Sequence, residues 1–141
     1  QDDMQLISQL LSLMEINKVD FTLCFRSLSK ALVGDKKSIK NLFKNDIAFD
    51  NWMALWKERL SHESISDEKI ASSMDLVNPL YIPRNHKVEE ALEAAVFHSN
   101  MKPFNKLHDI LKNPYQEVEG LHEYEKPDEN SKEKYKTYCG T

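Results

Sequence analysis

The stretch FDNWMALWKERL, residues 49–60, carries the clearest structural signal in the sequence. Its large apolar side chains recur every three or four positions, which is the spacing of one face of an α-helix. They are Phe49, Trp52, Met53, Trp56 and Leu60. The charged residues 57–59 fall mostly on the opposite side, as on a solvated face. We therefore expect a helix over 49–61 whose two tryptophans anchor a hydrophobic core rather than stack on a ligand.

The same helical periodicity recurs along most of the chain, and no segment alternates like a convincing strand. The expected helices cover about 3–15, 19–33, 49–61, 67–76, 86–98 and a last segment from Pro103 to Asn113, with a short helix at 38–44. The fold class is therefore all-α, with about six helices in an irregular bundle followed by an irregular C-terminal tail. Two apolar stripes are expected to be buried. They are Met4, Ile7, Leu10, Leu11 and Met14 in the first helix, and Val88, Leu92, Ala95 and Val96 in the helix over 86–98.

Proline and charge organise the rest of the chain. Residues 78–85 contain two prolines and are expected to form an extended connector, because each proline disfavours helix in the residue before it. Arg84 in this connector is interpreted as an internal ion-pair or carbonyl-binding residue, with a ligand phosphate as the lesser alternative. After residue 115 helical periodicity is lost. We therefore assign 1–115 to a helical domain and 116–141 to a charged extended tail that ends in Cys-Gly-Thr.

The tail is rich in acids and lysines, a composition typical of a segment that lies over a surface or is partly disordered. Apolar and aromatic side chains are spaced along it like anchors for a partner surface. These are Tyr115, Leu121, Tyr124, Tyr135 and Tyr138.

Composition excludes several function classes. The 141 residues include three glycines, far apart, so they form no Gly-rich phosphate loop. We expect neither catalytic nor cofactor-binding residues in this chain. The net charge of −4 offers no basic excess for nucleic acid or for an anionic membrane surface. No apolar run approaches the ~18 residues of a membrane span. Nucleic acid and membrane are therefore not expected as partners.

Histidine and cysteine spacing indicates no metal site, because neither H-x-x-x-H nor C-x-x-C occurs. Two cysteines and no visible signal peptide favour a cytoplasmic protein. Cys24, in the middle of a helix, is expected to be inert and at least half-buried. Cys139 suits a redox role better than nucleophilic catalysis, because thiol exchange needs exposure more than rigid geometry. The sequence opens without Met in a helical pattern, which suggests a piece of a longer protein.

From residue 20 onward, ordered motifs appear. They are DFTxxFRxLS (20–29), WxxxWxxRL (52–60), MxxxNPxxIPRNHxVExAL (74–92), NPY (113–115) and YxTYCGT (135–141). This set resembles the C-terminal region of the selenoprotein O family, a bacterial and mitochondrial group with a protein-kinase-like fold. The NPxxIPRNH block and the CGT terminus are its most specific parts.

The resemblance implies a parent protein that transfers AMP from ATP to hydroxyl side chains of proteins, with Mg or Mn as the divalent metal. The ATP-binding and metal-binding residues of the family lie upstream of the matched stretch. The implied partners are therefore the missing upstream kinase-like domain and the protein substrates of the whole enzyme, in the bacterial cytoplasm.

The resemblance also implies a regulatory role for Cys139. It stands where the family carries a cysteine or selenocysteine, which in some members pairs with a cysteine of the catalytic domain. A fully extended tail of 24 residues reaches up to about 80 Å, far enough for such pairing. A Cys24–Cys139 bridge is a less favoured alternative.

Two other function classes stay open. A stand-alone helical interaction module is expected to cover its own apolar surface, whereas an excised domain leaves a large apolar patch. A thiol enzyme would hold Cys139 near a histidine.

Overall fold

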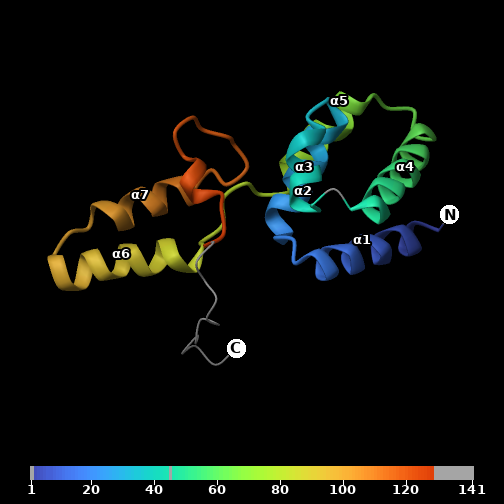
Figure 1. The fold of residues 1–141 in the computed structure, drawn as a ribbon. Coiled ribbons are helices and arrows are strands. Elements are labelled where there is room, and N and C mark those ends of the chain that lie inside the picture. The colour runs from blue at the N-terminus through green and yellow to red at the C-terminus, as the bar shows by residue number, and fades with distance from the viewer. Residues whose placement is uncertain (1, 45, 129–141) are drawn as a thin grey trace. The chain divides into compact units, whose positions relative to one another are not determined.

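The computed structural model describes residues 2–44 and 46–128 and divides the chain into two compact units, Gln1–Pro79 and Leu80–Thr141. The described residues contain seven α-helices, one short 3-10 helix and no strand, which confirms the all-α prediction (Figure 1). The expected division after residue 115, between helical domain and tail, stays a prediction.

The first unit contains five helices. They are α1 (Asp3–Asn17), α2 (Phe21–Leu32), α3 (Lys36–Leu42), α4 (Ile47–Ser61) and α5 (Asp67–Val77). Four of them begin at an aspartate whose carboxylate accepts a hydrogen bond from a backbone N–H of the first turn, which satisfies donors that the helix leaves open. These N-caps are Asp2, Asp20, Asp35 and Asp46. The short helix expected at 38–44 is therefore α3, which begins two residues earlier and is capped by Asp35.

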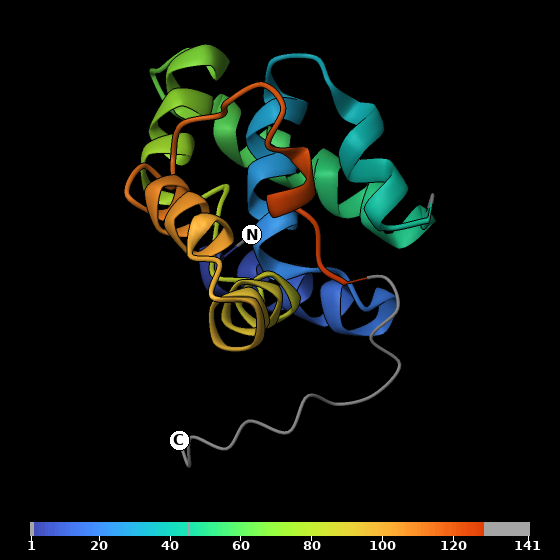
Figure 2. The ribbon, with the colours of Figure 1, turned by 90° about the vertical axis from the view of Figure 1, so that its left-hand side faces the viewer.

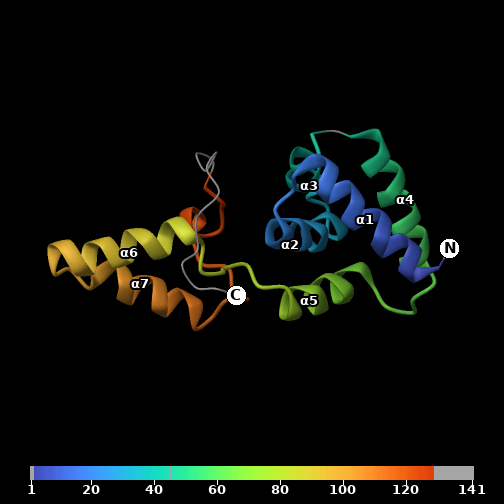
Figure 3. The same cartoon turned by 90° about the horizontal axis from the view of Figure 1, so that it is seen from below.

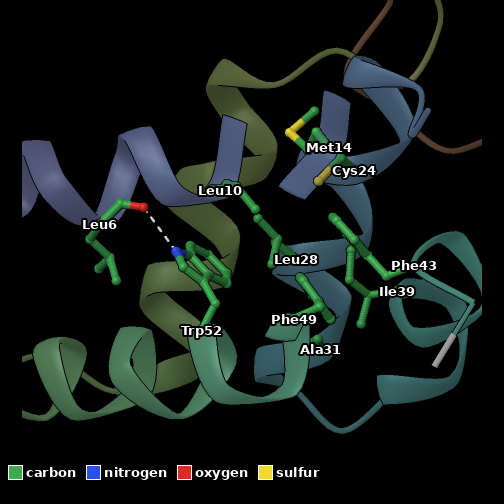
Figure 4. Packing of buried hydrophobic residues seen from close by; sticks show 10 residues of the cluster. All are labelled: Leu6, Leu10, Met14, Cys24, Leu28, Ala31, Ile39, Phe43, Phe49 and Trp52. Carbon is green, nitrogen blue, oxygen red and sulfur yellow. Dashed lines mark hydrogen bonds between the residues drawn. The ribbon is translucent and has the colours of Figure 1, made fainter. Parts of the chain in front are cut away.

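The core of this unit is built around aromatic rings from α4 and the end of α3 (Figure 4). Phe43 stacks on Phe49 with ring centroids 3.8 Å apart, and Phe49 stacks in turn on Trp52. The buried indole N–H of Trp52 donates to the carbonyl of Leu6 on α1 at 2.8 Å. The predicted role of Trp52 as a core anchor is confirmed. Trp56 is half-buried beside it.

Helix α1 packs along α4, and its buried face differs from the predicted one (Figure 3). Leu6, Leu10 and Met14 point into the core. The other three members of the expected stripe are exposed, namely Met4, Ile7 and Leu11. The prediction was therefore right for Leu10 and Met14 and wrong for the other three, because α1 is apolar on two adjacent sides and the contact with Trp52 turns the Leu6 side inward.

The remaining helices are joined through α2, which packs against both α3 and α5. Arg26 of α2 is buried, and its guanidinium donates to the backbone carbonyls of Asp75 and Asn78 at 3.1 and 3.3 Å. The same group pairs with the Asp75 carboxylate. A buried arginine thus satisfies carbonyls at the C-terminal end of α5, which a helix leaves without internal partners.

The second unit is a helical hairpin of α6 (Asn85–His98) and α7 (Lys102–Leu111), which lie side by side (Figure 2). A short 3-10 helix, η1 (His122–Tyr124), follows. The predicted inward stripe of α6 was wrong in part. Its buried residue is Ala91, whereas Leu92 and Val96 are exposed. Within this unit each helix of the hairpin has one neighbouring helix, so a broad apolar stripe is only partly covered.

We expect Trp52→Phe to lower the free energy of unfolding by about 1–2 kcal/mol, because it deletes the buried indole donor and part of the ring volume. Trp56→Phe, at a half-buried position, is the matched control and should cost less. Urea unfolding followed by circular dichroism measures both. Equal losses would contradict the importance of the Trp52–Leu6 hydrogen bond.

Candidate functional site

The predicted redox residue, Cys139, lies outside the described residues, and its role stays a prediction. The other cysteine, Cys24, lies in the core of the first unit with its side chain fully buried. Burial raises the pKa of its thiol to about 12. A thiol that does not ionise near neutral pH is a poor nucleophile and a poor partner for disulfide exchange. The expectation that Cys24 is inert therefore agrees with its surroundings.

Arg84 is buried in the connector between the two units' helices, and its guanidinium donates to the backbone carbonyl of Glu125 at 2.8 Å. The carbonyl-binding interpretation of Arg84 is confirmed. The contact joins the start of α6 to a residue 41 positions later and holds the segment after α7 against the hairpin.

Residues 116–125, which the sequence assigned to the charged tail, make several such contacts within the second unit. The phenol of Tyr81 accepts a hydrogen bond from the N–H of Val118 at 3.0 Å. Leu121 and Tyr124 pack against the small core of Leu80, Tyr81 and Ile110. These two predicted anchors therefore bind their own chain.

Two lysines also lie over the ring of Tyr124. The ammonium groups of Lys87 on α6 and Lys106 on α7 stand 5.3 and 5.1 Å from its centroid. Such contacts are attractive because the ring face is electron-rich. Lys87 also pairs with Glu90 and with Glu123. This set fixes the turn at η1 on both helices of the hairpin.

The first unit carries an apolar groove of about 280 Å³ between α1, α2, α4 and α5. Its apolar lining includes Ile7, Phe25, Trp56, Leu60 and Met74. A polar rim stands at the N-terminal end of α1, where Arg59 binds Asp3 at 2.7 Å and Glu63 at 2.6 Å. The hydrogen bond from Arg59 lowers the pKa of the Asp3 carboxyl from its ordinary value. Asp3 and Glu63 are solvent-exposed, so these ion pairs contribute little to the stability of the fold.

The sequence predicted the tryptophans as core but missed this groove. The signal available was a second apolar stripe on α1, beside the buried one. It is formed by Met4, Ile7 and Leu11, and Ile7 also lines the groove. We call this stripe together with the groove the α1 surface. It offers an apolar concavity without a group suited to proton transfer at its floor, so its geometry fits the packing of a protein segment.

The second unit also leaves apolar side chains in solvent. The exposed large apolar residues of its hairpin are Leu92, Val96, Phe97, Met101 and Phe104, and Phe97 is 77% exposed. Each unit thus carries uncovered apolar surface on elements that are otherwise well formed. Among the described residues, no helix has both the length and the apolar character needed to cross a bilayer.

Comparison with known proteins places these features in context. A family model described as "Protein adenylyltransferase SelO" matches residues 1–112. Proteins described as "Protein nucleotidyltransferase YdiU" are similar over nearly the whole chain. The one from Maridesulfovibrio salexigens is 39% identical over 97% of this chain and 28% of its own length. The one from Agrobacterium fabrum is 38% identical over 100% and 29%. The chain therefore spans less than a third of the length of the curated relatives it matches.

We expect Cys24 to resist a thiol reagent in the folded protein, because its thiol is buried and un-ionised. The test uses the Cys139→Ala variant, in which Cys24 is the remaining cysteine, with and without denaturant. Labelling by a chromogenic disulfide should be at least about 100-fold slower in the native state. A native rate equal to the denatured rate would mean that Cys24 is accessible.

Proposed function

The chain belongs to the SelO protein adenylyltransferase family, and from this membership we propose that it is the C-terminal helical part of an enzyme that transfers AMP from ATP to protein hydroxyl groups. The family description and the names of the relatives support nucleotidyl transfer to proteins. The coverage of less than a third of each relative supports a longer parent protein.

The role proposed for this part is structural. ATP and a divalent metal, Mg or Mn, would bind in the upstream kinase-like domain, which supplies the chemistry. The present chain has three dispersed glycines and lacks the glycine pattern of a phosphate loop. Its contribution would be to pack on that domain and stabilise it.

The observation that carries this role is the α1 surface. Apolar patches of this kind on a folded domain mark surfaces that another protein segment covers. The fold around it is complete, since Leu6, Leu10 and Met14 are buried while the neighbouring stripe faces solvent. A segment of the upstream domain with apolar side chains fits this groove. A stand-alone interaction module, the competing function, would instead receive its partner from another protein.

We expect the full-length parent to add AMP to itself or to a protein substrate when given ATP and Mg, and the 141-residue chain to add none. Intact-mass measurement of the substrate detects one AMP per modified site. Nucleotide transfer by the 141-residue chain alone would contradict the proposal that this chain is structural and that the upstream domain carries the catalytic residues.

The docking role has a matched pair of variants. Ile7 on the α1 surface and Ile65 in the loop before α5 are nearly equally exposed, at 51% and 53%. In the full-length parent we expect Ile7→Glu to lower the melting temperature by several degrees and to reduce AMP transfer, because it places a charge in a buried interface. Ile65→Glu should change neither.

In the 141-residue chain, the free energy of unfolding of both variants should lie within about 0.5 kcal/mol of that of the unsubstituted 141-residue chain, since both positions face solvent there. An Ile7→Glu effect in the parent no larger than that of Ile65→Glu would remove the support for docking at this surface.

We also propose that Cys139 regulates the parent by forming a disulfide with a cysteine of the upstream domain. Two thiols would transfer two electrons and two protons to a disulfide oxidant such as oxidised glutathione, which leaves as two thiols. The inert burial of Cys24 supports this choice, because a bridge to Cys24 would require the core to open.

The test compares AMP transfer by the wild-type parent and its Cys139→Ala variant, each with and without reductant. Reductant should activate the wild type several-fold and leave the variant unchanged. Equal activation of both proteins would show that Cys139 is not the switch.

A further inference from the structure

Three potential metal-binding side chains meet in the segment that follows α7. One ligand atom each from Glu117, His122 and Glu125 lies within 4.8 Å of the other two. We propose that these residues bind a divalent transition-metal cation of the zinc type. The inference rests on the local geometry of the second unit and is independent of the proposed transfer of AMP.

The 3-10 turn brings two of these ligands together. His122 begins η1 and Glu125 follows its end, three positions later. Residues three apart lie on the same side of a 3-10 helix. Their ligand atoms, Nδ1 of His122 and Oε1 of Glu125, are 3.1 Å apart. Neighbouring ligands about 2.0–2.2 Å from a zinc ion stand roughly 3.0–3.5 Å apart, so this pair already has the separation that one ion requires.

The backbone that carries the ligands is held in place before any ion binds. The N–H of Val118, next to Glu117, donates to the phenol of Tyr81. The carbonyl of Glu125 accepts from Arg84, and Leu121 packs against the small core of the unit. A site whose ligands are positioned in advance loses less conformational entropy on binding, which favours affinity.

The ligand side chains differ in their exposure to solvent, in a way that suits an ion at the surface. The Glu125 side chain is 12% exposed, whereas the His122 side chain is 66% exposed. An ion between them would therefore have a carboxylate on its inner side and open coordination positions for water on its outer side. The ion would close the loop between residues 117 and 125 and fix it more firmly to the hairpin.

The donor set selects the kind of ion. One imidazole nitrogen and two carboxylates are ligands of zinc and of similar transition metals. Magnesium prefers oxygen ligands alone and retains most of its water, so it fits the histidine poorly. The sequence predicted no metal site because it contains neither H-x-x-x-H nor C-x-x-C. The spacing Glu117-x4-His122-x2-Glu125 was the available signal.

The test is calorimetric titration of the 141-residue chain with zinc chloride alone. Every sample carries Cys139→Ser, because a thiolate is itself a zinc ligand. We expect one zinc ion per chain with a micromolar Kd. His122→Gln and Glu125→Gln should each weaken binding at least about tenfold. Thermal unfolding in the presence of a chelator checks that the variants fold, which their surface positions favour.

His108→Gln is the matched control, because His108 lies on α7 outside the cluster and its side chain is 61% exposed. It should bind zinc with the same affinity as the 141-residue chain that carries Cys139→Ser alone. Nuclear magnetic resonance of the imidazoles supplies a second readout, in which zinc should shift the signals of His122 before those of His108. Two results would overturn the site. One is a Kd for zinc of about 1 mM or weaker, which is roughly the range of non-specific binding, and the other is equal zinc affinity of His122→Gln and His108→Gln.

Discussion

The hydrogen bond from the Trp52 indole to the carbonyl of Leu6 sets the rotation of α1 in the first unit. An indole N–H in an apolar core needs an acceptor, since leaving it without one costs free energy. The acceptor here is a helix carbonyl, so α1 has to approach α4 with the Leu6 side facing the ring. Leu10 and Met14, one and two turns further on, follow Leu6 into the core.

That rotation decides which apolar surface stays in solvent. Once Leu6, Leu10 and Met14 are inside, the adjacent stripe that begins at Met4 and Ile7 has to point outward. The exposed stripe is therefore a consequence of good internal packing and does not reflect a poorly formed core. Apolar side chains of the α6–α7 hairpin stay exposed for a similar reason, because one neighbouring helix covers one side of each helix. A helix with apolar residues on two faces therefore leaves one of them in solvent when a single neighbour covers the other.

Much of the fold could be predicted from the sequence, because helical periodicity and proline positions are local signals. The helix of Trp52, the connector before α6 and the carbonyl-binding role of Arg84 are examples. The faces of α1 and α6 could not be predicted, since choosing between two apolar stripes depends on tertiary contacts such as the one at Leu6. The groove was missed for the same reason, since it joins residues of four helices whose proximity depends on chain folding. The cluster at His122 is different, because it lies within nine consecutive residues and its spacing is visible in the sequence.

The contacts of residues 116–125 change what the rest of the tail can reach. Counted from residue 116, a fully extended tail to Cys139 spans up to about 80 Å. The structure holds this segment against the hairpin through Val118, Tyr124 and the carbonyl of Glu125. The tether then begins at Lys126, and its 14 residues to Cys139 span at most about 50 Å. Any cysteine that pairs with Cys139 while these contacts persist must lie within that distance of Glu125. The anchoring of residues 116–125 thus limits where in the parent protein a disulfide partner of Cys139 can lie.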